Sequence, residues 1–316
     1  MIYAQLVAGF IYLLGGGDLL VRGAVALARR ARIPQSIVAL TIVGLGTSLP
    51  ELVVSVRAAL AGHPGLALGN VVGSNIANVL LVGGLAAGVH PIRTGDRNVA
   101  RSGIAMLAIS VLFAGMCVRG HALTRADGGV LLTLLVVGLA MMSLDALRAQ
   151  RLDTTPLNWV LGVPSSSSII ALFIGVGLVV LPLGAGLLVD SAVAIAGRLG
   201  VSETLIGLTV VAVGTSLPEV ATTVLAARRG KTGMVVGTIV GSNNFNILAI
   251  MGAATVASRG PVAIPARFLW LDLPLMVLVS LVLVTFSLRR RPIRRAAGAA
   301  LMATYVGYIG VLYLIG

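Results

Sequence analysis

The stretch SIVALTIVGLGTSLPELVVSVRAALA occupies residues 36–61, and residues 204–227 read TLIGLTVVAVGTSLPEVATTVLAA. Both contain the hexapeptide GTSLPE, at residues 46–51 and again at residues 214–219. Proline lacks a backbone donor and its ring clashes with the carbonyl four residues earlier, so a helix is predicted to break at each copy. Two apolar segments therefore each carry a helix break and a carboxylate near the middle.

The composition is that of an integral membrane protein. The 316 residues are 58% hydrophobic and 10% charged, whereas soluble domains carry about 25% charged residues. Apolar runs of about 20 residues recur along the chain, each long enough to cross ~30 Å of hydrocarbon. No ten-residue units of alternating polarity occur, which favours helices over a membrane barrel. We count ten runs, centred near Tyr12, Val43, Val79, Ala108, Val136, Gly175, Val211, Ile247, Val277 and Tyr305.

The basic residues that give a net charge of +13 predict an orientation in the membrane. Sixteen of the 23 cations fall in loops after odd-numbered spans and five after even-numbered spans. Because cytoplasmic loops carry excess Lys and Arg, both termini are expected outside the cytoplasm. The charge is thus a topology signal, and no nucleic-acid partner is expected. The N-terminus lacks a basic segment and a cleavage site, so the first span is predicted to be retained.

The sequence repeats itself after 168 residues. Residues 16–84 align with residues 184–252 without a gap, and about 30 of the 69 positions are identical. Five predicted spans separate equivalent points, so the second copy must enter the membrane from the opposite side. Inverted repeats are typical of secondary transporters, whose substrate sites form near the midplane where broken helices meet.

We therefore predict an all-α integral membrane protein of ten transmembrane helices in two inverted-topology five-helix repeats. Helices 2, 3, 7 and 8 are expected to be broken and to form a midplane ion site. Residues 1–147 form the first repeat, residues 166–316 form the second, and residues 148–165 are a polar linker. The motifs that the two repeats share lie at residues 44–51, 69–78, 212–219 and 237–246.

The glutamates of the two hexapeptides are the strongest candidates for a binding site. A carboxylate at membrane depth costs at least a few kcal/mol, so an intramembrane acid indicates function by default. If Glu51 and Glu219 meet, their charges repel unless a cation lies between them. Ca²⁺ takes six to eight oxygen ligands. Two bidentate carboxylates and the carbonyls of Thr47 and Thr215 would supply six, and no histidine or thiol that would favour Zn²⁺ or Cu⁺ is nearby in the sequence.

The hexapeptide also fits a purely structural role. Ser48, with Glu51 three residues later, is a capping-box pattern, and Pro50 suits the first turn of a helix. However, a break at membrane depth frees carbonyls that only protein, water or an ion can satisfy. The sequence therefore favours a hard-cation site over a helix cap alone.

A second pair of motifs, GSNIAN and GSNNFN, adds polar side chains. Ser74 and Asn78 lie four residues apart on one helix face, as do Ser242 and Asn246. Hydrogen bonds between helices are the alternative role for these side chains, and the glycines at four-residue spacing suit close helix packing. Because both motifs occur in both repeats, we expect an oxygen-lined site.

These features resemble the two α-repeats of the cation/Ca²⁺ exchanger superfamily, most closely its prokaryotic sodium/calcium exchanger branch. The resemblance covers nearly the whole chain and rests on ten spans, GTSLPE twice and GSNxxN twice. It implies that Ca²⁺ is bound by Glu51, Glu219, Thr47 and Thr215. It implies Na⁺ ligands at Ser48, Ser74, Ser216, Ser242, Glu51, Glu219, Gly44 and Ala212. Asn78 and Asn246 would line the centre.

The resemblance implies an electrogenic antiporter that exchanges Na⁺ for Ca²⁺ by alternating access, with the first and sixth helices sliding against a stationary core. Asn246 stands where potassium-dependent relatives have an aspartate, which disfavours K⁺ co-transport. An H⁺/Ca²⁺ antiporter using the same two glutamates is the alternative. The inverted repeat argues against a channel, and the lack of further catalytic residues argues against an intramembrane enzyme. We expect no cofactor, no obligate protein partner and a location in the plasma (inner) membrane of a prokaryote.

The remaining charged residues are expected to make local contacts. Asp18 and Arg22, four residues apart in the first span, are predicted to form a local ion pair or an interfacial anchor rather than to bind the transported ion. Asp272 is expected at the membrane interface. Acids near loops, such as Asp127 and Glu203, are expected to be solvated.

Overall fold

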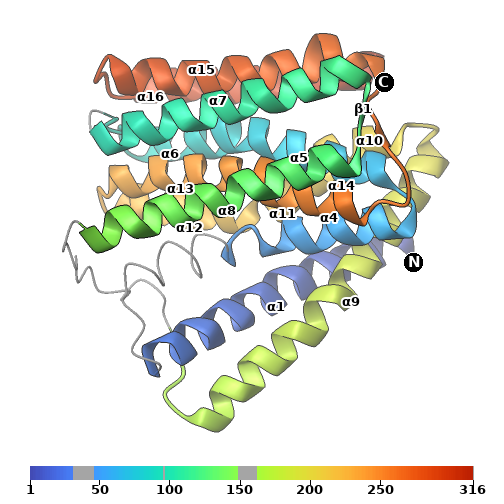
Figure 1. Cartoon of the computed structure of the whole chain (residues 1–316), viewed down its shortest axis with the longest axis horizontal. Coiled ribbons are helices and arrows are strands. Elements are labelled where there is room, and N and C mark those ends of the chain that lie inside the picture. Colours follow the sequence, from blue (N-terminus) through green and yellow to red (C-terminus); the bar gives the residue numbers. More distant parts are fainter. Residues whose placement is uncertain (31–45, 95–96, 149–161, 316) are drawn as a thin grey trace.

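The computed structural model describes residues 1–30, 46–94, 97–148 and 162–315, which are almost entirely helical (Figure 1). The elements of the first half are α1 (Ile2–Arg30), α4 (Leu49–Ala61), α5 (Pro64–Ala77), the π-helix η2 (Asn78–Val82), α6 (Gly83–Val89), α7 (Arg97–Gly120), β1 (Ala122–Leu123) and α8 (Arg125–Arg148). Those of the second half are α9 (Ser167–Leu199), α10 (Glu203–Ile206), η3 (Gly207–Val211), α11 (Ala212–Thr215), α12 (Leu217–Arg228), α13 (Thr232–Phe245), η4 (Asn246–Met251), α14 (Gly252–Ala257), β2 (Val262–Ala263), η5 (Phe268–Asp272), α15 (Leu273–Leu288) and α16 (Arg295–Ile315).

Seven described helices are long and apolar enough to cross a membrane, and a bent helix pair makes an eighth candidate span. The seven are Ile2–Leu27, Pro64–Val89, Ala100–Gly120, Ser167–Leu199, Thr232–Ala257, Phe268–Leu288 and Arg295–Ile315. Eight of the ten predicted centres fall in these eight segments. Of the other two, Val43 lies outside the described residues and Val136 lies in α8. The total of ten stays a prediction.

The GTSLPE motif of the second half bends its helix as expected. The segments Glu203–Thr215 and Leu217–Arg228 meet at an angle of 45°. Pro218 lies in the first turn of the second segment, where its missing donor is tolerated. In the first half, α4 likewise starts at Leu49 with a proline in its first turn. Residues 31–45, which precede this motif, are outside the described residues.

The prediction that the third and eighth helices are broken is wrong. Pro64–Val89 and Thr232–Ala257 are continuous helices. Each instead widens into a π-helical segment, beginning at Asn78 and at Asn246. The GSNxxN motifs contain no proline, and a π segment changes the hydrogen-bond spacing without ending the helix.

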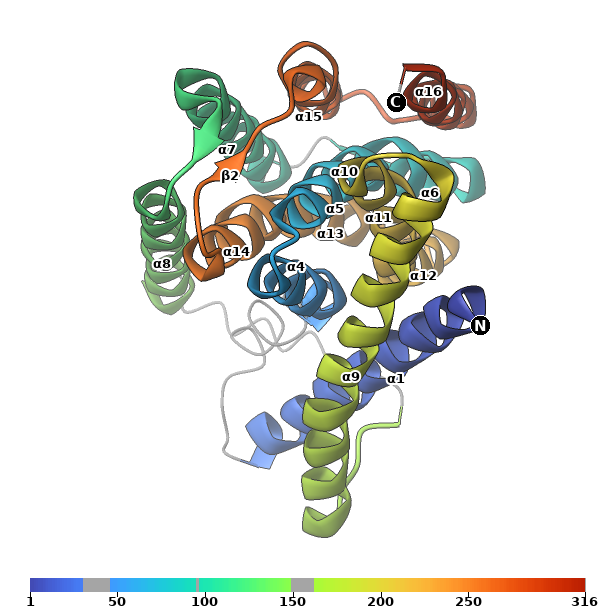
Figure 2. The ribbon, with the colours of Figure 1, turned by 90° about the vertical axis from the view of Figure 1, so that its right-hand side faces the viewer.

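The helices form a central group with outer helices on both sides (Figure 2). In this view α5 and α13 lie in the middle, α7, α15 and α16 lie on one side, and α1 and α9 cross on the other. Every residue of α5 from position 66 to position 77 is buried. By contrast, Val306 on α16 is 70% exposed and Leu178 on α9 is 58% exposed. Such apolar outer faces suit a lipid environment.

Glycines let α1 and α9 approach closely along their length. A Cβ atom added to Gly184 would lie 2.8 Å from the backbone nitrogen of Leu13. One added to Gly177 would lie 2.9 Å from the carbonyl oxygen of Gly16. Small residues at such crossings are typical of helix packing in membranes.

The last helix of each half packs closely against a glycine near the end of a central helix. A Cβ atom on Gly298 of α16 would lie 2.8 Å from the carbonyl oxygen of Gly84, and one on Gly128 of α8 would lie 2.9 Å from that of Gly252. Gly84 and Gly252 are equivalent under the 168-residue shift. The fifth and tenth predicted spans therefore pack on opposite halves in the same manner.

Candidate ion-binding site

The two hexapeptide glutamates lie buried in the middle of the helix group. Glu51 is in the first turn of α4 and Glu219 in the first turn of α12, and each is 1% exposed. Each carboxyl group contacts a residue of the other half's hexapeptide. The repeat thus places both acids at one buried location.

Each glutamate accepts a hydrogen bond from the hexapeptide serine of the other half. Ser216 Oγ donates to Glu51 Oε1 at 3.2 Å, and Ser48 Oγ donates to Glu219 Oε1 at 3.1 Å. Both serines stand at helix N-cap positions, yet neither makes a side-chain cap bond within the described chain. The capping-box reading is therefore wrong for these hydroxyls, because they bind a carboxylate across the interface between halves.

The GSNxxN serines reach the same location by different contacts. Ser242 Oγ donates to Glu219 Oε1 at 3.2 Å and lies 3.3 Å from Ser48 Oγ. Ser74 Oγ instead points to the carbonyl oxygen of Ala212, at 3.5 Å. Ser242 therefore contacts the Glu219 carboxylate directly, whereas Ser74 lies beside α11, the short helix that ends within the second hexapeptide.

Several buried polar atoms at this location have no hydrogen-bond partner among the described residues. They are Glu51 Oε2, Glu219 Oε2, Asn78 Oδ1, and both Asn246 Oδ1 and Nδ2. Both asparagines are 1% exposed. An unpaired buried polar atom is costly, and an unpaired buried carboxylate oxygen more so. These free oxygens are available to bind a cation or protons.

The remaining predicted ligands surround this cluster. Thr215 and Ala212 are fully buried on α11, and half-buried Thr47 lies in the turn before α4. Gly44 lies outside the described residues. The structure therefore gathers the other predicted residues into one region.

Two asparagines that sequence reasoning did not single out hold this region together. Asn243 Oδ1 accepts a hydrogen bond from Asn78 Nδ2 at 3.1 Å, and Asn243 Nδ2 donates to the carbonyl oxygen of Asn75 at 3.3 Å. Asn70 is the second, with its amide bound to both halves of the chain. Asn75 and Asn243 are the equivalent third positions of the two GSNxxN motifs. This repeated position is the sequence feature that could have indicated a role for Asn243.

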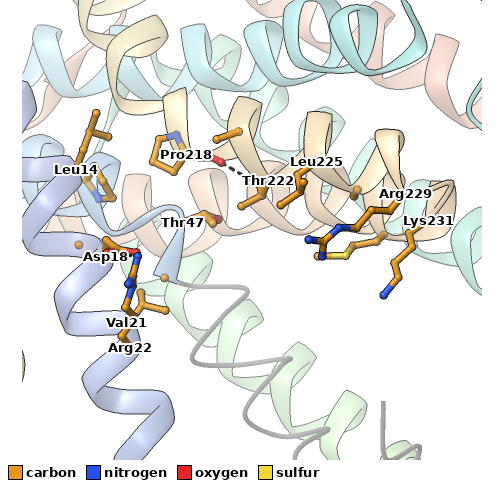
Figure 3. A pocket seen from close by; sticks show the side chains of 16 residues that line it. Leu14, Asp18, Val21, Arg22, Thr47, Pro218, Thr222, Leu225, Arg229 and Lys231 are labelled. Atoms are coloured by element: carbon orange, nitrogen blue, oxygen red, sulfur yellow. Dashed lines mark hydrogen bonds and ion pairs between the residues drawn. The ribbon is translucent and has the colours of Figure 1, made fainter. Parts of the chain in front are cut away.

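A cavity of about 400 Å³ lies between α1 and α12 and reaches the hexapeptides. Thr47 and Pro218, one from each hexapeptide, line it, and Asp18 projects into it from α1 (Figure 3). Arg229 and Lys231 lie at its other end, beyond the end of α12 (Figure 3). The cavity therefore connects the region of the buried acids with a basic edge of the protein.

The predicted ion pair in the first span is confirmed, because Arg22 lies 2.8 Å from Asp18. The expectation of solvated loop acids is wrong for Asp127, which is only 5% exposed and accepts a hydrogen bond from Arg119 at 2.8 Å. Glu203 is partly exposed and lies 2.8 Å from His63 Nδ1. Sequence alone did not show these partners, because Glu203 and His63 are 140 residues apart.

Asp272 is fully buried in the described structure, near the start of the candidate span Phe268–Leu288, and its expected place at the membrane interface stays a prediction. Tyr308 Oη donates to Asp272 Oδ1 at 2.8 Å, and Arg267 Nε donates to Oδ2 at 3.3 Å. The partner on α16 was not visible in the local sequence.

Comparison with known proteins is consistent with this architecture. The sequence profile of the family described as sodium/calcium exchanger protein matches residues 1–144 and 169–314. The inner membrane protein YrbG of Escherichia coli is 35% identical over 315 residues, which cover 98% of this chain and 96% of YrbG. The sodium/calcium exchanger MaX1 of Methanosarcina acetivorans is 31% identical over 346 residues, covering 98% of each chain.

A solved structure gives the same result. The sodium-calcium exchanger NCX_Mj, soaked with 10 mM Na⁺ and 10 mM Sr²⁺, matches with a TM-score of 0.67 and 29% identity, over 98% of this chain and 97% of that chain. The helices and these likenesses define a multi-pass membrane protein with the fold of an ion exchanger. The chain belongs to the sodium/calcium exchanger family of antiporters.

Proposed function

We propose that the protein exchanges Na⁺ for Ca²⁺ across the membrane and that Glu51 and Glu219 share the transported Ca²⁺. The observation that carries this proposal is the pair of free oxygens, Glu51 Oε2 and Glu219 Oε2, buried at one location. Two carboxylates in such a place repel each other unless positive charge joins them. A hard divalent cation satisfies both at once.

The proposed ligands follow from the geometry and from the family. Ca²⁺ takes both carboxylates and the backbone oxygens of Thr47 and Thr215. Na⁺ takes the carboxylates together with the hydroxyl and carbonyl oxygens of Ser48, Ser74, Ser216, Ser242, Gly44 and Ala212. Asn78 and Asn246 line the centre, and their free oxygens support this role.

Sharing of ligands explains the coupling. The double negative charge is neutralised by one Ca²⁺ or by Na⁺ ions, so the two cargoes exclude each other. An empty site would carry unpaired charge past an apolar barrier, which is costly. Only the ion-bound protein therefore switches between its inward-facing and outward-facing states, and uncoupled leak of ions is suppressed.

A difference between the two sides of the site supports alternating access. On one side, Val189 and Ala192 of α9 pack in one apolar cluster with Val54 and Ala58 of α4. The residues equivalent to Val54 and Ala58 in the second half are Thr222 and Ala226. Both line the cavity beside α1. One side is therefore packed and the other is hollow.

We further propose the full architecture of ten spans in two inverted five-helix repeats, residues 1–147 and 166–316, with both termini outside the cytoplasm. The reciprocal packing of Gly84 with α16 and of Gly252 with α8 supports it. The proposed location is the plasma membrane, with no cofactor, no enzymatic activity and no obligate partner. The name of the relative YrbG, an inner membrane protein, agrees with this location.

The coupling ion is tested by transport. MaX1 is named a sodium/calcium exchanger, which supports Na⁺. The alternative is H⁺, because protons would also satisfy the free carboxylate oxygens. Purified protein in proteoliposomes should take up ⁴⁵Ca²⁺ when an outward Na⁺ gradient is imposed at equal pH. Uptake driven by a pH gradient alone would overturn the Na⁺ proposal in favour of H⁺ exchange.

A further inference from the structure

Asn70, on α5, binds three groups from two neighbouring helices. Its side chain is fully buried. Asn70 Nδ2 donates to Ser55 Oγ at 2.9 Å and lies 3.4 Å from the carbonyl oxygen of Glu51. Asn70 Oδ1 accepts a hydrogen bond from Thr215 Oγ1 at 3.2 Å. One amide therefore ties α4 of the first half to α11 of the second.

The orientation of this amide is determined by its partners. The carbonyl oxygen of Glu51 only accepts, so it requires the Nδ2 side of Asn70. The single proton of the Thr215 hydroxyl lies between two acceptors, Asn70 Oδ1 at 3.2 Å and the carbonyl oxygen of Val211 at 3.0 Å. With Nδ2 toward Glu51, Asn70 presents its oxygen to Thr215, so its two ends contact the two halves.

The second half does not use the same arrangement. The position equivalent to Asn70 is Thr238, on α13. There the carbonyl oxygen of Glu219 accepts a hydrogen bond from Thr223 Oγ1 at 2.6 Å, within the same helix. The bridge from a third helix to both hexapeptides is thus a feature of Asn70.

We propose that Asn70 is a positioning residue that sets the affinity of the site for Ca²⁺. This inference rests on the proposed function. It joins Glu51 to Thr215, the two residues from opposite halves that would bind the same Ca²⁺. Ca²⁺ needs six to eight oxygens at once, so it depends on their relative position. Na⁺ shares the Glu51 carboxylate, but its other proposed ligands include four serine hydroxyls that Asn70 does not bind, so we expect Na⁺ affinity to depend on Asn70 less than Ca²⁺ affinity does.

The test replaces Asn70 with the residue that the second half uses. Asn70→Thr is too short to reach both partners, and Thr238→Ala is the matched control on the equivalent helix. In proteoliposomes, we expect Asn70→Thr to raise the Ca²⁺ concentration for half-maximal uptake about tenfold, as expected for loss of one or two buried hydrogen bonds. The maximal rate and the Na⁺ concentration for half-activation should change less than about twofold. Equal shifts for Ca²⁺ and Na⁺, or the same shift in Thr238→Ala, would overturn the proposal.

A second variant separates positioning from general damage to the fold. Thr215→Val removes the hydroxyl that Asn70 binds but keeps the backbone oxygen. If the bridge acts through this contact, the double variant should be shifted less than the product of the two single shifts. Fully multiplicative shifts would overturn the proposal.

Failure of the Asn70 proposal can be distinguished from failure of the proposed Na⁺/Ca²⁺ exchange. If the wild-type protein moves Ca²⁺ only with a pH gradient, the Na⁺ proposal fails. The half-saturating Ca²⁺ concentrations of Asn70→Thr and Thr238→Ala are then compared in that assay. An Asn70→Thr value equal to wild type would overturn the inference alone.

Discussion

Ser48 Oγ donates a hydrogen bond to Glu219 Oε1 at 3.1 Å, across 171 positions of sequence. The serine belongs to one hexapeptide and the glutamate to the other. The reverse bond, from Ser216 to Glu51, has almost the same length of 3.2 Å. Each half therefore completes the carboxylate environment of the other, so the site exists only when both halves are folded together.

The crossed serines should matter for Na⁺. Ser48→Ala and Ser216→Ala each remove a donor to a buried carboxylate and a proposed Na⁺ ligand. A hydrogen bond to a charged group is worth about 1.5–3 kcal/mol, so we expect the Na⁺ concentration for half-activation to rise about tenfold or more. Measurement of ⁴⁵Ca²⁺ uptake over a range of Na⁺ gradients checks this.

Ser110→Ala is the control for these variants. Ser110 is also buried, but it lies on α7 and binds the carbonyl oxygen of Met106. Its variant should keep the wild-type Na⁺ dependence. If all three alanine variants behave alike, the crossed serines have no specific part in Na⁺ binding.

Tyr308 should stabilise the fold through Asp272. Tyr308→Phe removes the donor to a fully buried carboxylate, and we expect a loss of about 1–3 kcal/mol in the free energy of unfolding. Tyr305→Phe is the matched control, because its buried hydroxyl has no partner among the described residues. Thermal melts in detergent should show a lower midpoint for Tyr308→Phe only. Equal midpoints would mean that the bond to Asp272 does not stabilise the protein.

The close crossing of α1 and α9 should not tolerate a methyl group. In Gly184→Ala, the new Cβ atom would lie 2.8 Å from the backbone nitrogen of Leu13, so the helices must separate. Overpacking of this kind costs about 1–3 kcal/mol. Gly186→Ala is the control on the same helix, since a Cβ atom there meets nothing within 4 Å in the described structure. We expect slower transport and a lower melting midpoint for Gly184→Ala alone, and unchanged values would contradict this packing.

The repeat made much of the site predictable. A shift of 168 residues pairs Glu51 with Glu219 and Ser48 with Ser216, so it indicated which side chains would meet without any structure. It did not indicate where the serine hydroxyls point. The local capping rule predicted that each serine hydroxyl would bind the backbone of its own helix. Packing between the halves instead directs each hydroxyl to the glutamate of the other half.

Other features depend on contacts that no local pattern encodes. Asn70 stands next to the glycine of its motif, but its partner Thr215 is 145 residues away. The burial of Asp272 could not be predicted either, because its partner Tyr308 lies 36 residues further along the chain on another helix. The π segments at Asn78 and Asn246 also went unpredicted, because a π segment has the same apolar composition as an α-helix.

Equilibrium binding of ⁴⁵Ca²⁺ to the purified protein tests most directly whether Glu51 and Glu219 share one ion. Wild-type protein should bind one Ca²⁺ per chain, and Na⁺ should compete for it. Glu51→Gln and Glu219→Gln should each weaken binding at least about a hundredfold, while size-exclusion profiles stay unchanged, because a buried divalent ion loses half its balancing charge. Retention of near-normal Ca²⁺ binding by either folded variant would contradict the shared site.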